Sequence, residues 1–198
     1  MTYTSDIVEQ FWNGLMKHLS ADDIEELSYA TGATGNQINQ LKKRFPAAPS
    51  ALIRLLERVN GTYWQQYGDH EIAVLILGSD VFEYPYYLKS VEQILTDNSH
   101  TQSIKKIYAK YFDEMPELVG EGIDPNLPLS NWLCFSDCMN NGGTSSLFID
   151  FDPASGGTAG QIVRFLHDPD SFKVIASSFE NYLQKMIDEN FSFLAQEE

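Results

Sequence analysis

Hydrophobic and polar positions alternate regularly from Leu147 to Asp152, early in the last third of the chain. From Leu147 to Asp152, apolar side chains recur at every second position, as they do in a strand with one buried face. The opposite face of this strand carries Phe148, Asp150 and Asp152. Pro153 has no backbone N–H to donate, so the strand is expected to end at Asp152-Pro153.

Two more short apolar runs follow this strand, at Gln161–Leu166 and Phe172–Ile175. A glycine-rich loop precedes the first run, and the turn His167-Asp168-Pro169-Asp170 separates the two. Short strands joined by short turns favour an antiparallel meander over crossover connections.

A helix is predicted directly after the meander. Ser177 and Glu180 have the spacing of a capping box, in which each side chain bonds the backbone amide of the other residue. The residues that follow form one apolar stripe at helical spacing: Phe179, Tyr182, Leu183, Met186 and Ile187. Such a stripe is suited to packing across a sheet face.

Helical patterns also dominate the N-terminal part. Residues 6 to 19 form an amphipathic stripe after Asp6, and Ser20 with Asp23 predicts a second, short helix ended by Gly32. Thr34 and Gln37 again have capping-box spacing, in a helix that Pro46 stops. A further helix is predicted from Pro49 to just before Gly61.

The middle of the chain is predicted to add strands and short helices. Glu71–Leu77 is a continuous apolar run typical of a central strand, and Val81–Leu88 predicts a second strand that Pro85 moves to an edge. Helical segments are expected near Ser90–Leu95 and Ile104–Phe112. The loop Asp113–Asp124 holds five acidic residues and no lysine or arginine.

The second half of the chain combines a tryptophan-led strand, an acidic glycine-rich turn and the strand and turn residues described above. The residues of this pattern are Trp132, Asp137, Gly142, Gly143, Asp150, Asp152, Pro153, Gly160, Gln161, Ile162, His167, Asp168, Ala176, Ser178 and Phe179. On these residues the chain resembles the SUKH superfamily, in its Smi/Knr cell-wall-assembly-regulator-like branch. A weaker first-half counterpart is a helix led by Pro49 that ends in Asn60-Gly61.

Pattern and resemblance together predict an α+β fold with a mostly antiparallel central sheet. N-terminal helices and a C-terminal helix are expected to flank this sheet. The expected organisation is one SUKH-like domain over residues 1–198, with residues 1–33 as an N-terminal helical addition. The resemblance further implies a protein without a known catalytic motif. Bacterial members of the superfamily are mostly immunity proteins that neutralise a cognate toxin, and fungal members are regulatory scaffolds.

The net charge narrows the choice of partner. Asp and Glu number 28 against 13 Lys and Arg, which gives −15. Such a charge opposes binding to nucleic acid and to anionic membranes, and it steers basic proteins toward the chain. It also keeps a protein soluble. The first residues lack the pattern of a signal peptide, and no apolar run reaches membrane-spanning length, so a cytoplasmic location is expected.

Two groups of residues invite a chemical interpretation. Cys134 and Cys138 have no paired histidines, so buried or incidental thiols are expected rather than a metal site. A disulfide is disfavoured in a reducing compartment. Four carboxylates, in a strand end and in a turn expected near it, offer a metal-assisted hydrolase as an alternative: Asp150, Asp152, Asp168 and Asp170. Capping of local backbone amides is the simpler role for them.

The leading hypothesis is a protein-binding module without a cofactor, most specifically an immunity protein that docks a basic toxin. Aromatic side chains enrich interface cores, and acidic residues sit at their rims. A regulatory scaffold in cell-envelope assembly is the second hypothesis, and the hydrolase is the third. The predicted partner-binding residues are Asp80, Glu83, Tyr84, Trp132, Asp137, Asp150, Asp152 and Asp168.

Overall fold

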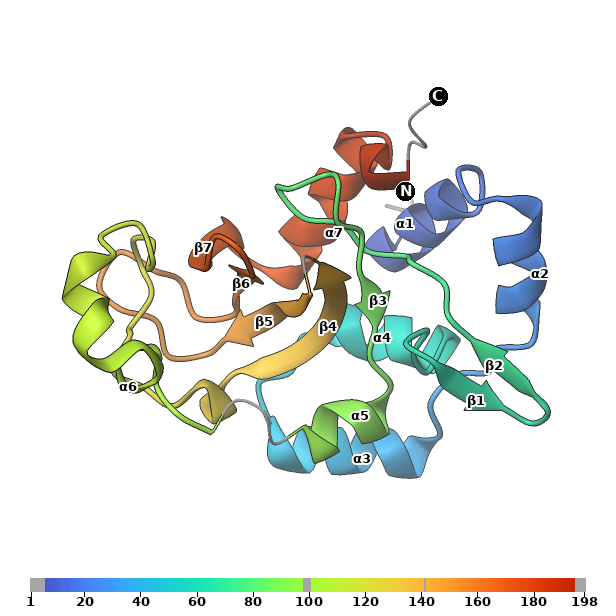
Figure 1. The fold of residues 1–198 in the computed structure, drawn as a ribbon. Helices are drawn as coiled ribbons and strands as arrows, with labels where there is room; N and C mark the ends of the chain where they lie inside the picture. Colours follow the sequence, from blue (N-terminus) through green and yellow to red (C-terminus); the bar gives the residue numbers. More distant parts are fainter. Residues whose placement is uncertain (1–5, 98–100, 141, 195–198) are drawn as a thin grey trace, which may run out of the picture.

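The fold is organised around a five-stranded antiparallel sheet in the order β3-β4-β5-β6-β7. It is seen in a computed structural model that describes residues 6–97, 101–140 and 142–194 (Figure 1). The strands are β3 (Tyr87–Leu88), β4 (Leu133–Asn140), β5 (Gly143–Asp150), β6 (Gln161–Leu166) and β7 (Ser171–Ala176). Each of these strands pairs with its neighbour along the chain, which confirms the predicted meander.

The pairing of β5 with β6 fixes which residues share an end of the sheet. Asp150 lies opposite Gln161, and Ser146 lies opposite Phe165. β5 ends at Asp150, two residues before the predicted end, because the chain turns away ahead of Pro153.

Helices surround the sheet, and their N-terminal caps follow from the sequence. The α-helices are α1 (Ile7–Leu15), α2 (Ala21–Ser28), α3 (Gly35–Arg44), α4 (Ser50–Arg58), α5 (Val91–Thr96), α6 (Ile104–Tyr108) and α7 (Phe179–Asp188). Short 3₁₀ turns are η1 (Ala109–Glu114), η2 (Leu129–Asn131) and η3 (Ser192–Leu194). Asp6 and Ser20 cap α1 and α2, and Thr34 with Gln37 forms the predicted capping box of α3. None of the described helices is long and apolar enough to cross a membrane.

Both faces of the sheet are buried, each under a different part of the chain. One face, with Leu147 and Ile149, packs against side chains of α1, α3, α4, α5 and α7. The other face, with Phe148 and Val163, packs under the segment that runs from α6 to η2 and Trp132. The alternation predicted for Leu147–Asp152 thus separates two cores rather than a core from solvent.

The two ends of the described chain pack together. α1 lies against α7, and the rings of Phe11 and Phe191 are 5.6 Å apart between centroids. Gly14 permits this approach, because a Cβ at this position would lie 2.4 Å from the ring of Phe191. α1 and Leu27 of α2 belong to the same buried cluster as the sheet.

Two of the predicted strands are much shorter than expected. Only the start of Glu71–Leu77 is a strand: β2 (His70–Ile72) pairs with β1 (Gln65–Tyr67) in a separate hairpin. In the rest of that run Val74, Ile76 and Leu77 are buried in the same cluster as the helices, and burial alone does not require sheet pairing. Val81–Leu88 is a loop up to Tyr86, and only β3 joins the sheet.

The cap of α7 also differs from the prediction by one residue. Ser178, not Ser177, accepts the hydrogen bond from the Asn181 amide, at 3.1 Å. Ser177 instead accepts a bond from the side chain of Asn181, at 2.7 Å. Adjacent serines offer two competing caps, and spacing to Glu180 selected the wrong one.

Candidate functional site

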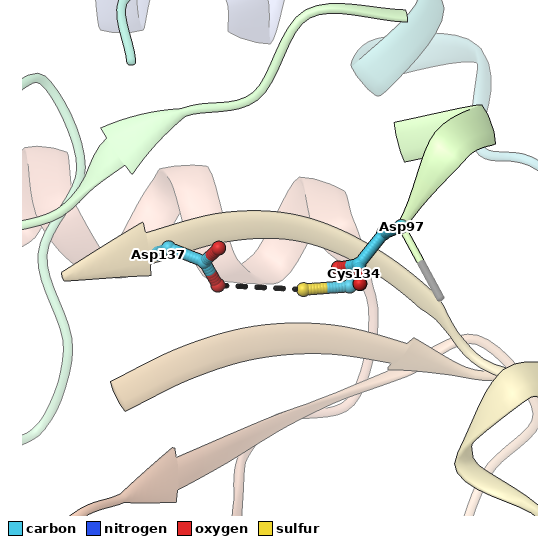
Figure 2. Close-up of side chains that lie close together, drawn as sticks. All are labelled: Asp97, Cys134 and Asp137. Carbon is cyan, nitrogen blue, oxygen red and sulfur yellow. Dashed lines mark hydrogen bonds between the residues drawn. The ribbon is translucent and has the colours of Figure 1, made fainter. Parts of the chain in front are cut away.

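A lysine ammonium lies inside the protein, where it meets two carboxylates and a thiol. Lys89 is 5% exposed, and its Nζ lies 2.6 Å from Asp97 Oδ2 and 2.7 Å from Asp137 Oδ2. The same nitrogen lies 3.3 Å from Cys134 Sγ. Figure 2 shows the side chains of Asp97, Cys134 and Asp137 close together between the end of α5 and β4. We call these four residues the Lys89 cluster.

A bulge in β4 brings two members of the Lys89 cluster together. Cys134 and Asp137 are three residues apart, so they would face opposite ways in a regular strand. The register of β4 against β5 shifts between Cys134 and Ser136. Such a bulge re-aims the side chains that follow it. The Cys134 thiol therefore donates to Asp137 Oδ1 at 3.6 Å, the contact drawn in Figure 2.

Local structure also fixes the lysine and the second carboxylate. Lys89 stands between β3 and Ser90, the N-cap of α5, and its backbone amide donates to Phe135 of β4. Asp97 is the C-cap residue of α5. The short helix therefore connects the ammonium to one of its own partners.

The electrostatics of the Lys89 cluster favour a charged lysine and a neutral thiol. Burial acts to lower the pKa of Lys89, but Cys134, Asp137 and Asp97 outweigh it and raise that pKa above its usual range. Burial, followed by the charge of Asp137, raises the pKa of Cys134 well above its ordinary value. A protonated buried thiol is a poor nucleophile. The cluster is thus suited to holding the fold rather than to covalent chemistry.

The same cluster has donor types found in metal sites. The ligand atoms of Asp97, Cys134 and Asp137 lie within 4.8 Å of one another. Lys89 Nζ, however, already lies among them and supplies the positive charge they require. A metal ion would have to displace this ammonium and remove the proton of a thiol with a raised pKa. The residues therefore fit an ammonium group and do not fit a metal. Cys134 and Cys138 are both free and buried, as expected.

A second buried charge cluster lies on β6 and β7. Arg164, 4% exposed, donates from Nε to Asp80 Oδ1 at 2.8 Å and from a terminal nitrogen to Ser171. Lys173 Nζ lies 2.8 Å from the other oxygen of Asp80. Burial acts to raise the pKa of Asp80, but bonds from Arg164 and Lys173 lower it to about 2. Asp80, a predicted partner-binding residue, is thus committed to an internal ion pair.

Three other predicted partner-binding residues are buried in the fold. Asp150 is 0% exposed and accepts hydrogen bonds from Gln161 Nε2 and from the amide of Asp152, each at 3.0 Å. Burial raises the pKa of Asp150, and these hydrogen bonds oppose it. Trp132 is 3% exposed and packs its ring edge-on against Phe148. Asp137 belongs to the Lys89 cluster.

The expectation that four aspartates converge is wrong. Asp150 stands beside Gln161 at one end of the β5–β6 pair. Asp168 and Asp170 belong to the β6–β7 turn, beyond Leu166 at the other end of β6. Five residues of β6 at about 3.3 Å each separate the two ends. Asp170 is engaged by Tyr108 through a hydrogen bond from the phenol.

The remaining predicted residues reach the surface in different places. Asp152 and Asp168 are exposed, at opposite ends of the sheet. Glu83 is exposed and Tyr84 is half-buried, in the loop that precedes β3. Partner contact by these residues stays a prediction. Glu83 lines a large surface hollow.

That hollow is a groove of about 740 Å³. It lies between the α1–α2 turn, the segment after β2, the loop before β3, and η3. We call it the α2 groove, lined by His18, Leu19, Ser20, Asp23, Ala73, Leu75, Phe82, Glu83, Pro85, Phe193 and Leu194. Phe82 is 48% exposed, and its ring adds to the apolar surface that Leu75 and Leu194 provide in the same groove.

A second, shallower hollow of about 420 Å³ lies between α2 and the β1–β2 hairpin. Two carboxylates border the α2 groove and five border this second hollow, where the rings of Tyr29 and His70 stack 3.6 Å apart. We call these carboxylates the acidic rim: Asp22, Asp23, Glu25, Glu26, Asp69, Glu71 and Glu83. Within the described parts of the chain, no Lys or Arg lines either hollow or forms an ion pair with a rim carboxylate.

Most of the chain, from residue 32 to residue 185, matches the SMI1/KNR4 family (SUKH-1). This chain belongs to the SMI1/KNR4 family. The match confirms the resemblance seen in the residues from Trp132 to Phe179, and family membership indicates a protein-interaction module. A comparison with curated proteins gave no match.

Some residues that line the α2 groove lie inside the region matched by the SMI1/KNR4 family, and others lie outside it. The match begins before α3, so α1 and α2 lie outside it, and it ends within α7, before η3. Asp23 and Leu194 therefore come from outside the matched region, whereas Phe82 and Glu83 come from inside it.

Sequence reasoning missed Lys89 and Arg164, the buried cations of the two clusters. Arg164 did leave a signal, because a charged residue inside the apolar run Gln161–Leu166 requires a buried partner. That partner, Asp80, is 84 residues away. The sequence around Lys89 gave no such signal, because a lysine at the end of a short edge strand is ordinarily exposed to solvent.

Proposed function

We propose that this protein is a non-catalytic protein-binding module and, most specifically, an immunity protein that binds and neutralises a cognate toxin. Family membership supports the protein-binding role. The observation that carries the choice of partner is the acidic rim, whose carboxylates have no Lys or Arg partner in the described structure. A surface of this kind favours a basic protein.

Neutralisation would proceed by occlusion. The acidic rim attracts a basic toxin from a distance, which raises the rate of association at low salt. A few apolar and aromatic side chains beneath it then supply most of the affinity once water is excluded. No bond in either protein needs to break.

The internal chemistry of the chain supports a non-catalytic role. The charged groups of the Lys89 cluster and of the Arg164–Asp80 pair bond one another inside the fold. The carboxylates of the proposed hydrolase lie at two ends of the sheet, too far apart to act on one substrate.

Co-expression with the product of the adjacent upstream gene tests the proposal. We expect that product to be toxic when it is expressed alone, to lose its toxicity beside this protein, and to elute with it as a complex in size-exclusion chromatography. A toxin that still kills, with no complex formed, would contradict the immunity role.

Deletion of the gene separates immunity from a scaffold role in cell-envelope assembly. An immunity protein becomes essential only when the neighbouring toxin is present. A deletion strain with envelope defects and unchanged toxin resistance would favour the scaffold.

A further inference from the structure

The α2 groove combines features that a protein segment, rather than a small ion, would recognise. Its apolar surface includes Leu75 and Leu194, both half-buried, and the half-exposed ring of Phe82. Exposed apolar surface inside a hollow is stabilised when another apolar side chain covers it. The groove is therefore suited to accept large apolar side chains.

The charges beside the groove restrict what else such a segment can carry. Asp23 and Glu83 border the groove itself, and five more rim carboxylates continue along α2 and the hairpin. An acidic segment would meet repulsion along its whole length. Lysine and arginine residues, in contrast, would place their charges at the rim while their aliphatic stems cover apolar surface.

We propose that the α2 groove is the docking surface for one segment of the toxin, a segment that carries large apolar side chains flanked by Lys and Arg. This rests on the proposed immunity function. The apolar side chains enter the groove beside Phe82, and the basic residues face the acidic rim.

The position of the groove fits a specificity determinant. Two of its walls, the α1–α2 turn and η3, lie outside the region matched by the family. We therefore expect related chains that share the sheet to differ in these walls and to present different grooves.

Binding of a synthetic peptide tests the groove without the toxin. The probe is a short rhodamine-labelled peptide of lysines and leucines in amphipathic order, titrated with the full-length protein in fluorescence anisotropy. A second peptide with serine at every leucine position has the same charge. We expect the serine peptide to bind roughly tenfold more weakly or worse, since it cannot fill the groove.

Matched variants locate the binding surface. The groove variant carries Asp23→Asn, which preserves the bond from Ser20, and Glu83→Lys. The control variant carries Asp113→Asn and Glu117→Lys, the same charge change on the exposed segment after α6. We expect roughly tenfold weaker binding of the leucine peptide by the groove variant and less than about a twofold change by the control. Equal weakening by both variants, or no weakening by either, overturns the proposal.

Photo-cross-linking with the toxin gives a second readout. A photoreactive phenylalanine is placed at Phe82, and in a control protein at Tyr111, which is 54% exposed and belongs to η1, an element that does not line the groove. We expect cross-linked toxin from position 82 alone. Cross-linking from position 111 alone, or from neither position, counts against the groove.

The toxin experiment separates the two proposals. If the wild-type protein neutralises the toxin and the groove variant does so equally well, the groove is wrong and the immunity function stands. If the wild-type protein fails to neutralise, the immunity function is wrong, and the peptide titration still decides whether the groove binds basic apolar segments.

Discussion

Carboxylates of the two internal charge clusters pair with Lys or Arg, whereas the carboxylates of the acidic rim have no such partner in the described structure. Asp137 and Asp97 share the ammonium of Lys89, and Asp80 is held by Arg164 and Lys173. The rim carboxylates stand together on α2, the hairpin and the loop before β3, and no cation of the described structure pairs with them. Figure 1 shows α2 and the hairpin at the end of the molecule opposite α6.

The acidic residues behind the net charge of −15 therefore include two different groups, buried carboxylates that are paired with cations and rim carboxylates that are not. Charges that leave water must be matched, because an unpaired buried ion is strongly destabilising. Charges that stay in water need no match, and mutual repulsion among them is the small cost of a surface that attracts cations. The buried pairs maintain the fold, and the rim is available for binding.

Lys89→Met should have the largest effect among substitutions that test this contrast. Methionine is unbranched and nearly as long as lysine, but it leaves Asp97 and Asp137 without their cation. We expect a loss of about 3–5 kcal/mol in the free energy of unfolding, measured by chemical denaturation. Lys173→Met is the matched control: its side chain is 60% exposed and Asp80 retains Arg164, so the loss should stay below about 1 kcal/mol. Equal losses would abolish the distinction between inner and outer charges.

Asp80→Asn should have an intermediate, pH-dependent effect. The pKa of Asp80 is lowered from 3.8 to about 2, so the folded state prefers the ionised form. The stabilisation is present above pH 3.8 and is lost as the pH falls through about 2. We expect wild type to exceed the variant by about 1–2 kcal/mol at neutral pH, after allowance for solvent screening, and the difference to shrink toward pH 2. A difference that does not vary with pH in denaturation experiments would show that Asp80 gains nothing from its charge.

Charge reversal on the rim should have the smallest effect on stability. The double variant Glu25→Lys and Glu71→Lys relieves repulsion among exposed carboxylates and places a cation in the C-terminal half of α2. We expect the free energy of unfolding at low salt to stay within about 0.5 kcal/mol of wild type or to rise. A loss above about 1 kcal/mol would mean that these acids stabilise the fold, contrary to their assignment to binding.

Capping residues and strand alternation predicted those helices and strands whose limits depend on neighbouring residues in the sequence. Thr34 and Gln37 fixed the start of α3, and the alternation around Phe148 identified β5. The apolar run after Glu71 misled, because burial against helices and burial in a sheet select the same residues. Only the contacts of the folded chain distinguish the two.

The candidate site was less predictable because its parts are distant in sequence. Asp23 and Glu83 belong to separate elements that meet only through packing, and no spacing rule connects them. The error over Asp150 and Asp168 has a geometric cause: an antiparallel hairpin places the end of one strand beside the start of the next, so residues on successive turns lie at opposite ends.

The packing of α1 against α7 bears on how this protein is handled in the laboratory. Phe11 and Phe191 lie on either side of the region matched by the family, yet their rings meet. A recombinant fragment cut to the shared boundaries would lack both rings and would uncover the part of α7 that packs against α1. If such a fragment aggregates, the cause would be the loss of α1 and of the segment after α7, so an expressed protein should keep both flanking segments.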